Sequence, residues 1–157
     1  MRRFQRSHVA FVAALVLTSL ALCRSGSAQT LVGVRGGAYL DHGDPFIGGE
    51  VLVGLDHDLF FNPNVEVVFG DRSTTGAFNF DVHYDFARRG TAFFWVGGGL
   101  AVIYRNPEGA GDSTTDAGAN ILFGVGFRGS RRWIPYIQAK VVAAGDSDFA
   151  LGFGIRF

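Results

Sequence analysis

Large apolar side chains alternate with small or polar ones along much of this chain, and this period of two constrains the fold more than any other feature. Successive side chains of a β-strand point to opposite faces of a sheet, so the pattern predicts strands that each have one apolar face. Three segments show it best, with the apolar sets Phe78, Phe80, Val82, Tyr84 and Phe86; Ile121, Phe123, Val125 and Phe127; and Phe149, Leu151, Phe153, Ile155 and Phe157.

Extended along the chain, the alternation predicts eight strands separated by short segments rich in Gly, Asp, Ser and Arg. Each strand has about 10 residues, the length that a tilted strand needs to cross the hydrocarbon of a membrane. An even number of strands brings both ends to the same side, and eight strands close into a barrel that side chains can fill. We therefore predict an all-β, eight-stranded, antiparallel up-and-down transmembrane β-barrel over residues 29–157, with strands at 30–40, 46–56, 59–70, 75–86, 91–104, 116–128, 133–144 and 148–157.

A soluble barrel would alternate in the same way, so the surroundings of the apolar face need a separate argument. In the clearest strands that face consists mainly of Phe, Val, Leu and Ile, whereas charged residues fall on the opposite face or at strand ends. The opposite face also holds many of the 23 glycines, which suit a narrow lumen. These features favour lipid outside the barrel. The alternative is a soluble periplasmic barrel with an apolar ligand inside.

The first 28 residues differ from the rest and predict export. They combine a basic start, an apolar run over 9–22 and small residues at 26–28, which are the three parts of a secretory signal. We predict a signal peptide over 1–28, cleaved before Gln29. Cys23 would allow a lipidated N-terminus instead, but Leu22 stands before it, where a small residue is required.

Charge and hydropathy of the remaining residues exclude two classes. The first 28 residues hold four of the 14 basic residues and none of the 14 acidic ones, so 29–157 carries a net negative charge. A nucleic-acid partner, which would require a basic face, is not expected. No apolar stretch in 29–157 approaches 20 residues, so no spanning helix is expected either.

The last eight residues, Ala-Leu-Gly-Phe-Gly-Ile-Arg-Phe, end on an aromatic residue, Phe157. Ile155 lies two positions before it and Gly152 five positions before it. After eight alternating segments, this pattern resembles the C-terminal strand of small bacterial outer-membrane β-barrels of the OmpA and OmpX type, whose assembly machinery reads the final aromatic residue. The family prefers a polar residue seven positions before the end, where this chain has Ala150.

The resemblance implies a monomer in the bacterial outer membrane with both termini in the periplasm. It also implies contact with outer-membrane lipids and lipopolysaccharide, and insertion by the barrel-assembly machinery with periplasmic chaperones. The expected outer loops are 41–45, 71–74, 105–115 and 145–147, and the expected periplasmic turns are 56–58, 87–90 and 129–132.

Charged residues on the expected inner face are balanced in sign. Because an unpaired buried charge is costly, balance favours a narrow lumen closed by ion pairs over a water-filled pore. Arg35 on the first strand can reach Glu50 on the second, and Arg156 would close the seam beside the first strand. A path for small ions or solutes is the alternative. The predicted lumen network comprises Arg35, Glu50, Glu66, Asp81, His83, Asp85, Arg128, Lys140 and Arg156.

Aromatic residues near the ends of the expected strands suit the headgroup layer of a membrane. We predict an interfacial position for Phe46, Phe60, Trp95, Tyr104 and Trp133.

No cofactor or metal site is expected. Asp81, His83 and Asp85 share one strand face, but a zinc site would need ligands converging from another strand, and lumen salt bridges explain the set without a metal. Gly124, Gly126 and Gly129 have dinucleotide-loop spacing, yet they lie within an expected strand and precede a basic turn instead of a helix.

Some eight-stranded outer-membrane barrels are enzymes that modify lipid A, and their catalytic residues form recognisable sets. Deacylases of that kind use a His with a Ser two residues later, a pair that 29–157 lacks. Palmitoyl transferases use a His with a neighbouring Asp and Ser in outer loops, and only His42, Asp71 and Ser73 are loosely comparable. We therefore predict that the chain is not an enzyme and has a structural or surface-interaction role in the cell envelope. A narrow channel and a lipid A-modifying barrel are the alternatives.

Overall fold

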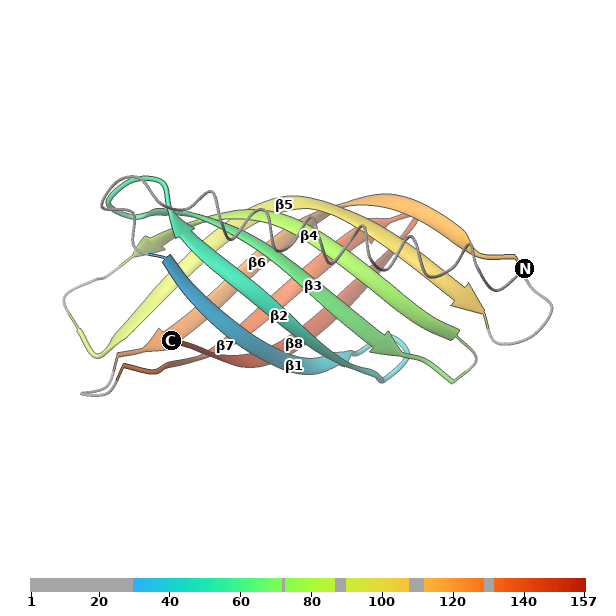
Figure 1. Cartoon of the computed structure of the whole chain (residues 1–157), viewed down its shortest axis with the longest axis horizontal. Helices are drawn as coiled ribbons and strands as arrows, with labels where there is room; N and C mark the ends of the chain where they lie inside the picture. Colours follow the sequence, from blue (N-terminus) through green and yellow to red (C-terminus); the bar gives the residue numbers. More distant parts are fainter. Residues whose placement is uncertain (1–29, 72, 87–89, 108–111, 129–131) are drawn as a thin grey trace, which may run out of the picture.

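The protein is an eight-stranded antiparallel β-barrel, in which each strand pairs with the next and β8 closes the wall against β1 (Figure 1). The computed structural model describes residues 30–71, 73–86, 90–107, 112–128 and 132–157, so the expected signal peptide lies outside the described residues. No helix in the described ranges is long and apolar enough to span a membrane. The predicted eight-stranded antiparallel architecture is confirmed, with strands β1 Thr30–Tyr39, β2 Asp44–Gly54, β3 Leu59–Phe69, β4 Ser73–Phe86, β5 Ala92–Pro107, β6 Thr114–Phe127, β7 Ile134–Ala144 and β8 Asp146–Arg156.

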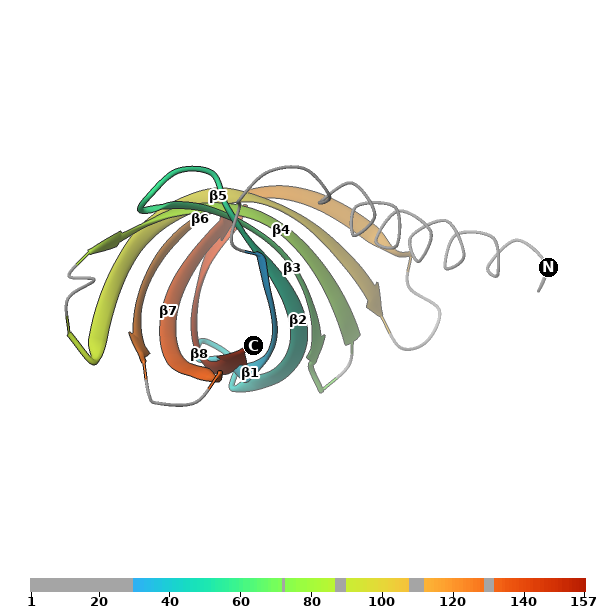
Figure 2. The same ribbon diagram turned by 60° about the vertical axis from the view of Figure 1, so that its left-hand side comes forward.

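The alternation of the sequence becomes the two faces of the barrel wall. On β4, Phe80 and Tyr84 are exposed on the outside, whereas Asp81 and His83 are buried inside. The other strands repeat this arrangement as they curve around the lumen (Figure 2). Large apolar side chains therefore cover the outer surface, and most buried polar side chains meet in the interior.

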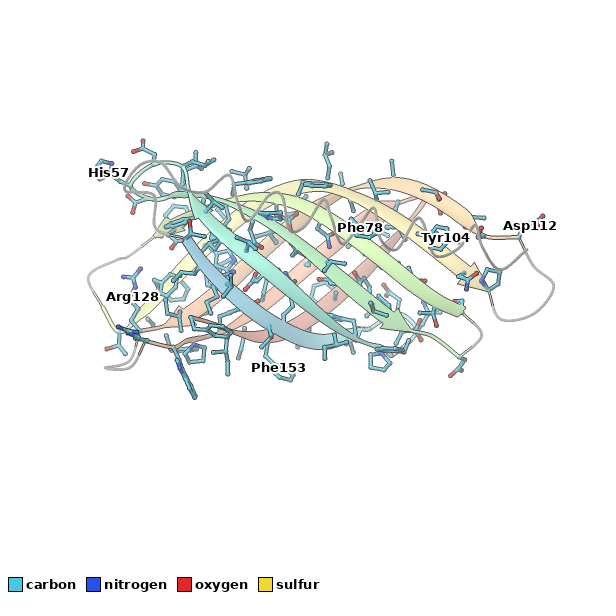
Figure 3. The ribbon with its side chains drawn as sticks, in the orientation of Figure 1. His57, Phe78, Tyr104, Asp112, Arg128 and Phe153 are labelled. Atoms are coloured by element: carbon cyan, nitrogen blue, oxygen red, sulfur yellow. The ribbon has the colours of Figure 1, made fainter. Side chains whose placement is uncertain are left out.

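The barrel has two distinct ends. β1 begins and β8 finishes at the end of the barrel where β2, β4 and β6 also finish, which we call the terminus end. We call the opposite end, where β1, β3, β5 and β7 finish, the loop end. It holds Gly145, whose positive φ of 86° permits a one-residue turn between β7 and β8. Figure 3 places His57 and Arg128 at the terminus end and Asp112 at the loop end.

The hairpin of β5 and β6 is longer than the sequence pattern predicts. The ladder continues to the pair Arg105 and Thr114, so the connection expected over 105–115 shrinks to 108–113. An ion pair between Arg105 Nη1 and Asp116 Oδ2, 2.5 Å apart, supports this extension. The residues after Tyr104 show no apolar alternation, because both faces of the hairpin are polar there.

Inward glycines lie directly opposite large side chains of the neighbouring strand. Gly124 is paired with Trp95, and a Cβ at position 124 would fall on the indole ring. Gly154 faces Tyr136 in the same way. Because a glycine has no side chain, the large side chain on the neighbouring strand can lie over it on the inner face of the wall, so a narrow lumen can be filled to high density. Further pairs are Gly126 with Phe93, Gly97 with His83, Gly99 with Asp81, and Gly33 with Glu50.

Apolar groups pack above and below the polar centre of the lumen. One cluster near the loop end contains Ala77, Ala101, Ile103, Val142 and Ala144. Another, nearer the terminus end, contains Phe93, Trp95, Leu122 and Tyr136. The charged residues between them are thus kept away from bulk water. Phe46, Val68 and Ala150 form a third cluster.

Candidate functional site: the polar lumen

Glu66 on β3 forms the first anionic centre of the lumen and is fully buried. Its Oε2 accepts hydrogen bonds from Lys140 Nζ at 2.7 Å and from the Tyr39 hydroxyl at 2.7 Å. Arg35 Nη2 lies 3.0 Å from Oε1. One carboxylate therefore holds two cations and one hydroxyl, from β1 and β7.

Glu50 on β2 forms the second anionic centre. Arg156 donates from Nε to Oε1 at 2.8 Å and from Nη2 to Oε2 at 3.2 Å, a two-pronged contact that fixes the guanidinium plane. Asn62 donates to Oε2 at 3.0 Å, and Arg35 Nη1 lies 3.8 Å away. Because Arg35 contacts both Glu50 and Glu66, the two centres form one cluster, which we call the central cluster.

The central cluster ties together strands that are distant in the sequence. Arg35 belongs to β1, Lys140 to β7 and Arg156 to β8, while the two glutamates belong to β2 and β3. Arg156 thus reaches across β1 to Glu50, and Lys140 crosses the lumen to Glu66. These contacts brace the seam between β8 and β1, where the sheet closes.

The side-chain amides of asparagines hold Asp81, a feature that the balance of charges in the sequence did not predict. Asn64 donates to its Oδ2 at 2.9 Å and Asn120 donates to its Oδ1 at 2.9 Å. Asn79 donates to Asn64 at 2.9 Å and accepts from Asn120 at 2.8 Å. Each asparagine shares strand parity with a charged inward residue, so parity would have identified them.

His83 and Asp85 form a separate pair near the terminus end, with Nδ1 and Oδ1 3.0 Å apart. The imidazole stacks on Phe60 at a centroid distance of 5.6 Å and lies 5.5 Å from the Trp95 ring. Trp95 Nε1 donates to Gln138 Oε1 at 3.3 Å. Aromatic rings and one carboxylate therefore fix the orientation of this histidine.

The predicted interfacial position is wrong for three of the five aromatic residues. Phe46, Phe60 and Trp95 are buried in the lumen, whereas Tyr104 and Trp133 are exposed on the outside. The reason is parity along the strand: Phe60 has the parity of Glu66, Phe46 that of Glu50, and Trp95 is the register partner of Asp85. Closeness to a strand end misled the prediction, and the opposing glycines leave room for such rings inside.

Arg128 lies outside the central cluster although it was grouped with it. The side chain is half-buried at the terminus end, and its guanidinium carbon lies 4.4 Å from the centroid of the Phe93 ring. This is a cation–π geometry. Five of the nine predicted lumen residues form the central cluster, namely Arg35, Glu50, Glu66, Lys140 and Arg156. The other four, Asp81, His83, Asp85 and Arg128, occupy neighbouring positions.

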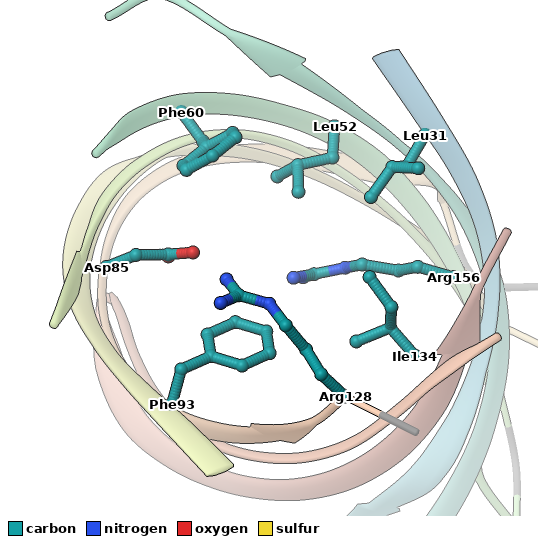
Figure 4. Close-up of a pocket in the computed structure, with 8 residues that line it drawn as sticks. All are labelled: Leu31, Leu52, Phe60, Asp85, Phe93, Arg128, Ile134 and Arg156. Atoms are coloured by element: carbon teal, nitrogen blue, oxygen red, sulfur yellow. The ribbon is translucent and has the colours of Figure 1, made fainter. Parts of the chain in front are cut away.

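Two cavities flank the paired charges. The one at the terminus end has a volume of about 230 Å³ and is shown in Figure 4. The one at the loop end has about 240 Å³, and its lining includes Tyr39, His42, Asp44, Arg105 and Asp148. The central cluster and the asparagines separate the two.

The three residues of the predicted assembly signal lie in the seam strand or just after it. Ile155 and Phe157 point outward, and Gly152 faces the lumen against the Phe46 ring. Phe157 exchanges two backbone hydrogen bonds with Val32, at 2.9 and 3.0 Å. The last residue therefore extends the pairing of β8 with β1.

His42, Asp71 and Ser73, the residues loosely comparable to those of lipid A palmitoyl transferases, do not all line one cavity. His42 and Ser73 line the loop-end cavity, whereas Asp71 is exposed in the connection between β3 and β4. Among the described residues, no group of three or more His, Cys, Asp or Glu side chains could hold a metal ion.

The barrel shares its fold with small outer-membrane proteins of known structure. The N-terminal β-barrel domain of Pseudomonas aeruginosa OprF matches with a TM-score of 0.73 and 16% identity, over 83% of this chain and 98% of that domain. Neisserial surface protein A matches with a TM-score of 0.65 and 12% identity, over 82% and 94%. Ail, the attachment invasion locus protein of Yersinia pestis, matches with 0.51 and 11%, over 83% and 97%. No protein-family model matches the chain, and no curated protein has a matching sequence. The chain therefore has the fold of small eight-stranded outer-membrane β-barrels, the group that its C-terminal pattern resembles.

Proposed function

We propose that the chain is an integral outer-membrane β-barrel with a structural or surface-interaction role in the cell envelope. One observation carries this proposal. Among strand residues whose side chains are described, every Asp, Glu, Lys and Arg lies on the inward parity, and the outward positions are mainly apolar. Exposed apolar patches of this extent are rare on soluble monomers, and a lipid-facing wall explains them.

The proposed orientation places the terminus end in the periplasm and the loop end outside. The loop end carries the acidic residues Asp41, Asp44, Asp71 and Asp112, which would meet the divalent cations that bridge lipopolysaccharide phosphates. Outer-membrane lipids are then the main partner of the wall. The barrel-assembly machinery and periplasmic chaperones would deliver the chain, which we propose to be a monomer.

Extraction and gel mobility test the membrane assignment. We expect the protein to stay with the membrane until detergent is added, and to migrate differently before and after boiling because a closed barrel resists unfolding in the loading buffer. Release without detergent would refute the assignment and would mean that the apolar face meets something other than lipid.

We further propose that the lumen is closed. An ion that crosses it would have to separate Glu66 from Lys140 and Arg35, or Glu50 from Arg156, and each separation leaves a buried charge unpaired. The expected result in planar bilayers is no steady conductance.

The two cavities support a narrow channel as the second candidate, because they leave only the middle of the lumen to be opened. A channel would show a steady conductance, and neutralising Asp81 or Arg128 would change its ion selectivity. Absence of conductance in the parent and in Asp81→Asn and Arg128→Gln would rule this candidate out.

We also propose that the barrel has no catalytic role in lipid A modification. The test is the lipid A profile of cells that overproduce the barrel, compared with cells that overproduce His42→Ala. An altered profile in the parent that the variant lacks would establish the enzyme instead.

A further inference from the structure

The loop-end cavity has an apolar floor and a charged mouth. Its floor consists of side chains from two apolar clusters of the lumen, namely Val68, Ala77, Ile103 and Val142. The charged residues of the lining stand nearer the end of the barrel. Asp44 begins β2 there. Asp148 precedes the buried Ala150 on β8, and Arg105 follows the buried Ile103 on β5. A bound molecule would therefore meet charge at the mouth and apolar groups beneath it.

Two carboxylates at this mouth lack a partner among the described residues. The side chains of Asp44 and Asp148 are half-buried and make no hydrogen bond or ion pair with any of them. Arg105 also lines the cavity, but it is already paired with Asp116. The described lining therefore leaves two negative charges without compensation. Because uncompensated charge is costly where water is partly excluded, these carboxylates favour a cationic ligand.

The first strand separates the two carboxylates. Asp44 is the register partner of Tyr39 on β1, and Tyr39 is the partner of Ala150, two residues from Asp148. At the usual strand spacing of about 4.8 Å, the Cα atoms of the two acids are roughly 10 Å apart. A ligand that carries two separated positive charges matches this arrangement better than a single compact ion.

A metal ion fits this cavity poorly. Metal ions such as Ca²⁺ and Mg²⁺ require several oxygen ligands around one centre. Among the described residues, no group of three or more His, Cys, Asp or Glu side chains could supply such a set. The apolar floor would also offer nothing to a hydrated ion, whereas it would pack against a hydrocarbon chain.

The volume limits the size of the ligand. About 240 Å³ holds roughly eight water molecules at about 30 Å³ each, and it lies below the range of about 300–1,000 Å³ usual for drug-sized ligands. A molecule of roughly seven or eight non-hydrogen atoms therefore fits.

We propose that the loop-end cavity is a binding site for a short linear diamine. One ammonium group lies on Asp44, the other lies on Asp148, and the alkyl chain between them lies over the apolar floor. The central cluster and the asparagines close the inner side of the cavity, so the ligand enters and leaves by the loop end. The site goes beyond the proposed envelope role and needs only the folded barrel.

The test uses cadaverine, the linear diamine with five carbons, and two probes that each lack one of its features. Pentylamine has the chain but only one ammonium group, and Mg²⁺ has two charges but no chain. Each is titrated by calorimetry into the full barrel folded in an uncharged detergent. At about pH 8 the amines are protonated, the carboxylates are ionised and the exposed imidazole of His42 at the rim is neutral. We expect cadaverine to bind saturably at one site, at least about tenfold more tightly than either probe.

Matched variants assign the two ammonium groups. Asp44→Asn and Asp148→Asn should each weaken cadaverine at least about tenfold, to the level of pentylamine, because each removes one charge-assisted contact. Asp71→Asn is the control, since it removes the same charge from an exposed acid at the same end that does not line the cavity, and it should bind cadaverine like the parent. Thr75→Trp keeps both carboxylates but fills the cavity, so it should abolish binding.

Gel mobility shows which variants fold, so loss of binding is separated from loss of the barrel, and extraction with detergent tests the membrane assignment independently. The proposal is overturned if cadaverine does not saturate up to its solubility, or if pentylamine or Mg²⁺ binds as tightly. It is also overturned if folded Asp44→Asn or Asp148→Asn binds cadaverine like Asp71→Asn, or if folded Thr75→Trp binds it like the parent.

Discussion

Replacing Glu66 by glutamine should reverse the sign of the effect that a second substitution, Lys140→Met, has on the free energy of unfolding. In the parent, Glu66 accepts from Lys140 at 2.7 Å, and it would keep Arg35 and Tyr39 without the lysine. Lys140→Met should therefore cost about 1.5–3 kcal/mol of unfolding free energy, the value of one charge-assisted hydrogen bond. Glu66→Gln leaves two buried cations without their main partner and should cost about 3–5 kcal/mol.

In the Glu66→Gln background, Lys140 has lost the acid that it contacts. Removing its ammonium should then restore on the order of 2 kcal/mol, so the double variant should be more stable than Glu66→Gln alone. The difference between the effects of Lys140→Met in the two backgrounds gives a coupling free energy of about 3.5–5 kcal/mol, above the roughly 0.5–3 kcal/mol usual for contacting residues.

Urea titration of the barrel folded in phospholipid vesicles measures these free energies, with tryptophan fluorescence as the signal, to which Trp95 contributes from inside the lumen and Trp133 from outside. Arg132→Met is the matched control, because Arg132 is exposed and outside the central cluster, so its effect should be the same in both backgrounds. If Lys140→Met costs the same with and without Glu66, the two residues are uncoupled and the reasoning about the central cluster is refuted.

Three further expectations concern other parts of the barrel. Gly124→Ala places a methyl group on an indole ring and should cost about 1–3 kcal/mol in the urea assay, whereas Gly76→Ala, which meets nothing within 4 Å, should cost nearly nothing. Deleting Phe157 removes the last two backbone hydrogen bonds of the seam and should lower the free energy of unfolding by about 1–2 kcal/mol. Phe157→Ala keeps these bonds and should mainly lower the amount of barrel assembled in cells. An equal loss of stability in both variants would contradict this reasoning. The pKa of the exposed Asp56 carboxyl lies below its ordinary value, chiefly because the His57 ring forms a hydrogen bond with it and secondly because the His57 backbone N–H donates to it. His57→Ala removes only the first contact and should therefore raise that pKa part of the way in an NMR titration. No change in the pKa would disprove the contact with the ring. Any stability from this contact is present above the unfolded-state pKa and is lost as the pH falls through the lower, folded-state pKa.

Strand parity made most of the barrel predictable. Once Phe80 and Tyr84 are assigned to the outside of β4, the side chains between them must face inward, and the register carries that assignment to the next strand. The three aromatic residues whose positions were wrongly predicted follow the same rule. Trp95 was judged by its distance from a strand end, although its parity already placed it in the lumen.

The pairing inside the lumen was less accessible from the sequence. Lys140 and Glu66 lie on β7 and β3, four strands apart, so their contact depends on the curvature and width of the closed barrel. No pattern along one strand contains that information. The asparagines around Asp81 escaped notice because uncharged amides do not enter a balance of charges, although they satisfy a carboxylate well.

The glycines opposite large side chains have a consequence for how the strands align. Alternation is unchanged when one strand slips past its neighbour by two residues, so it cannot by itself choose among such alignments. The glycines can. A two-residue slip of β6 along β5 would set Trp95 against Leu122 in one direction, or Phe93 against Arg128 in the other, where each ring now meets a glycine. Because the stagger of its strands helps to fix the width of a barrel, the spacing of its glycines is part of what sets the diameter of this lumen.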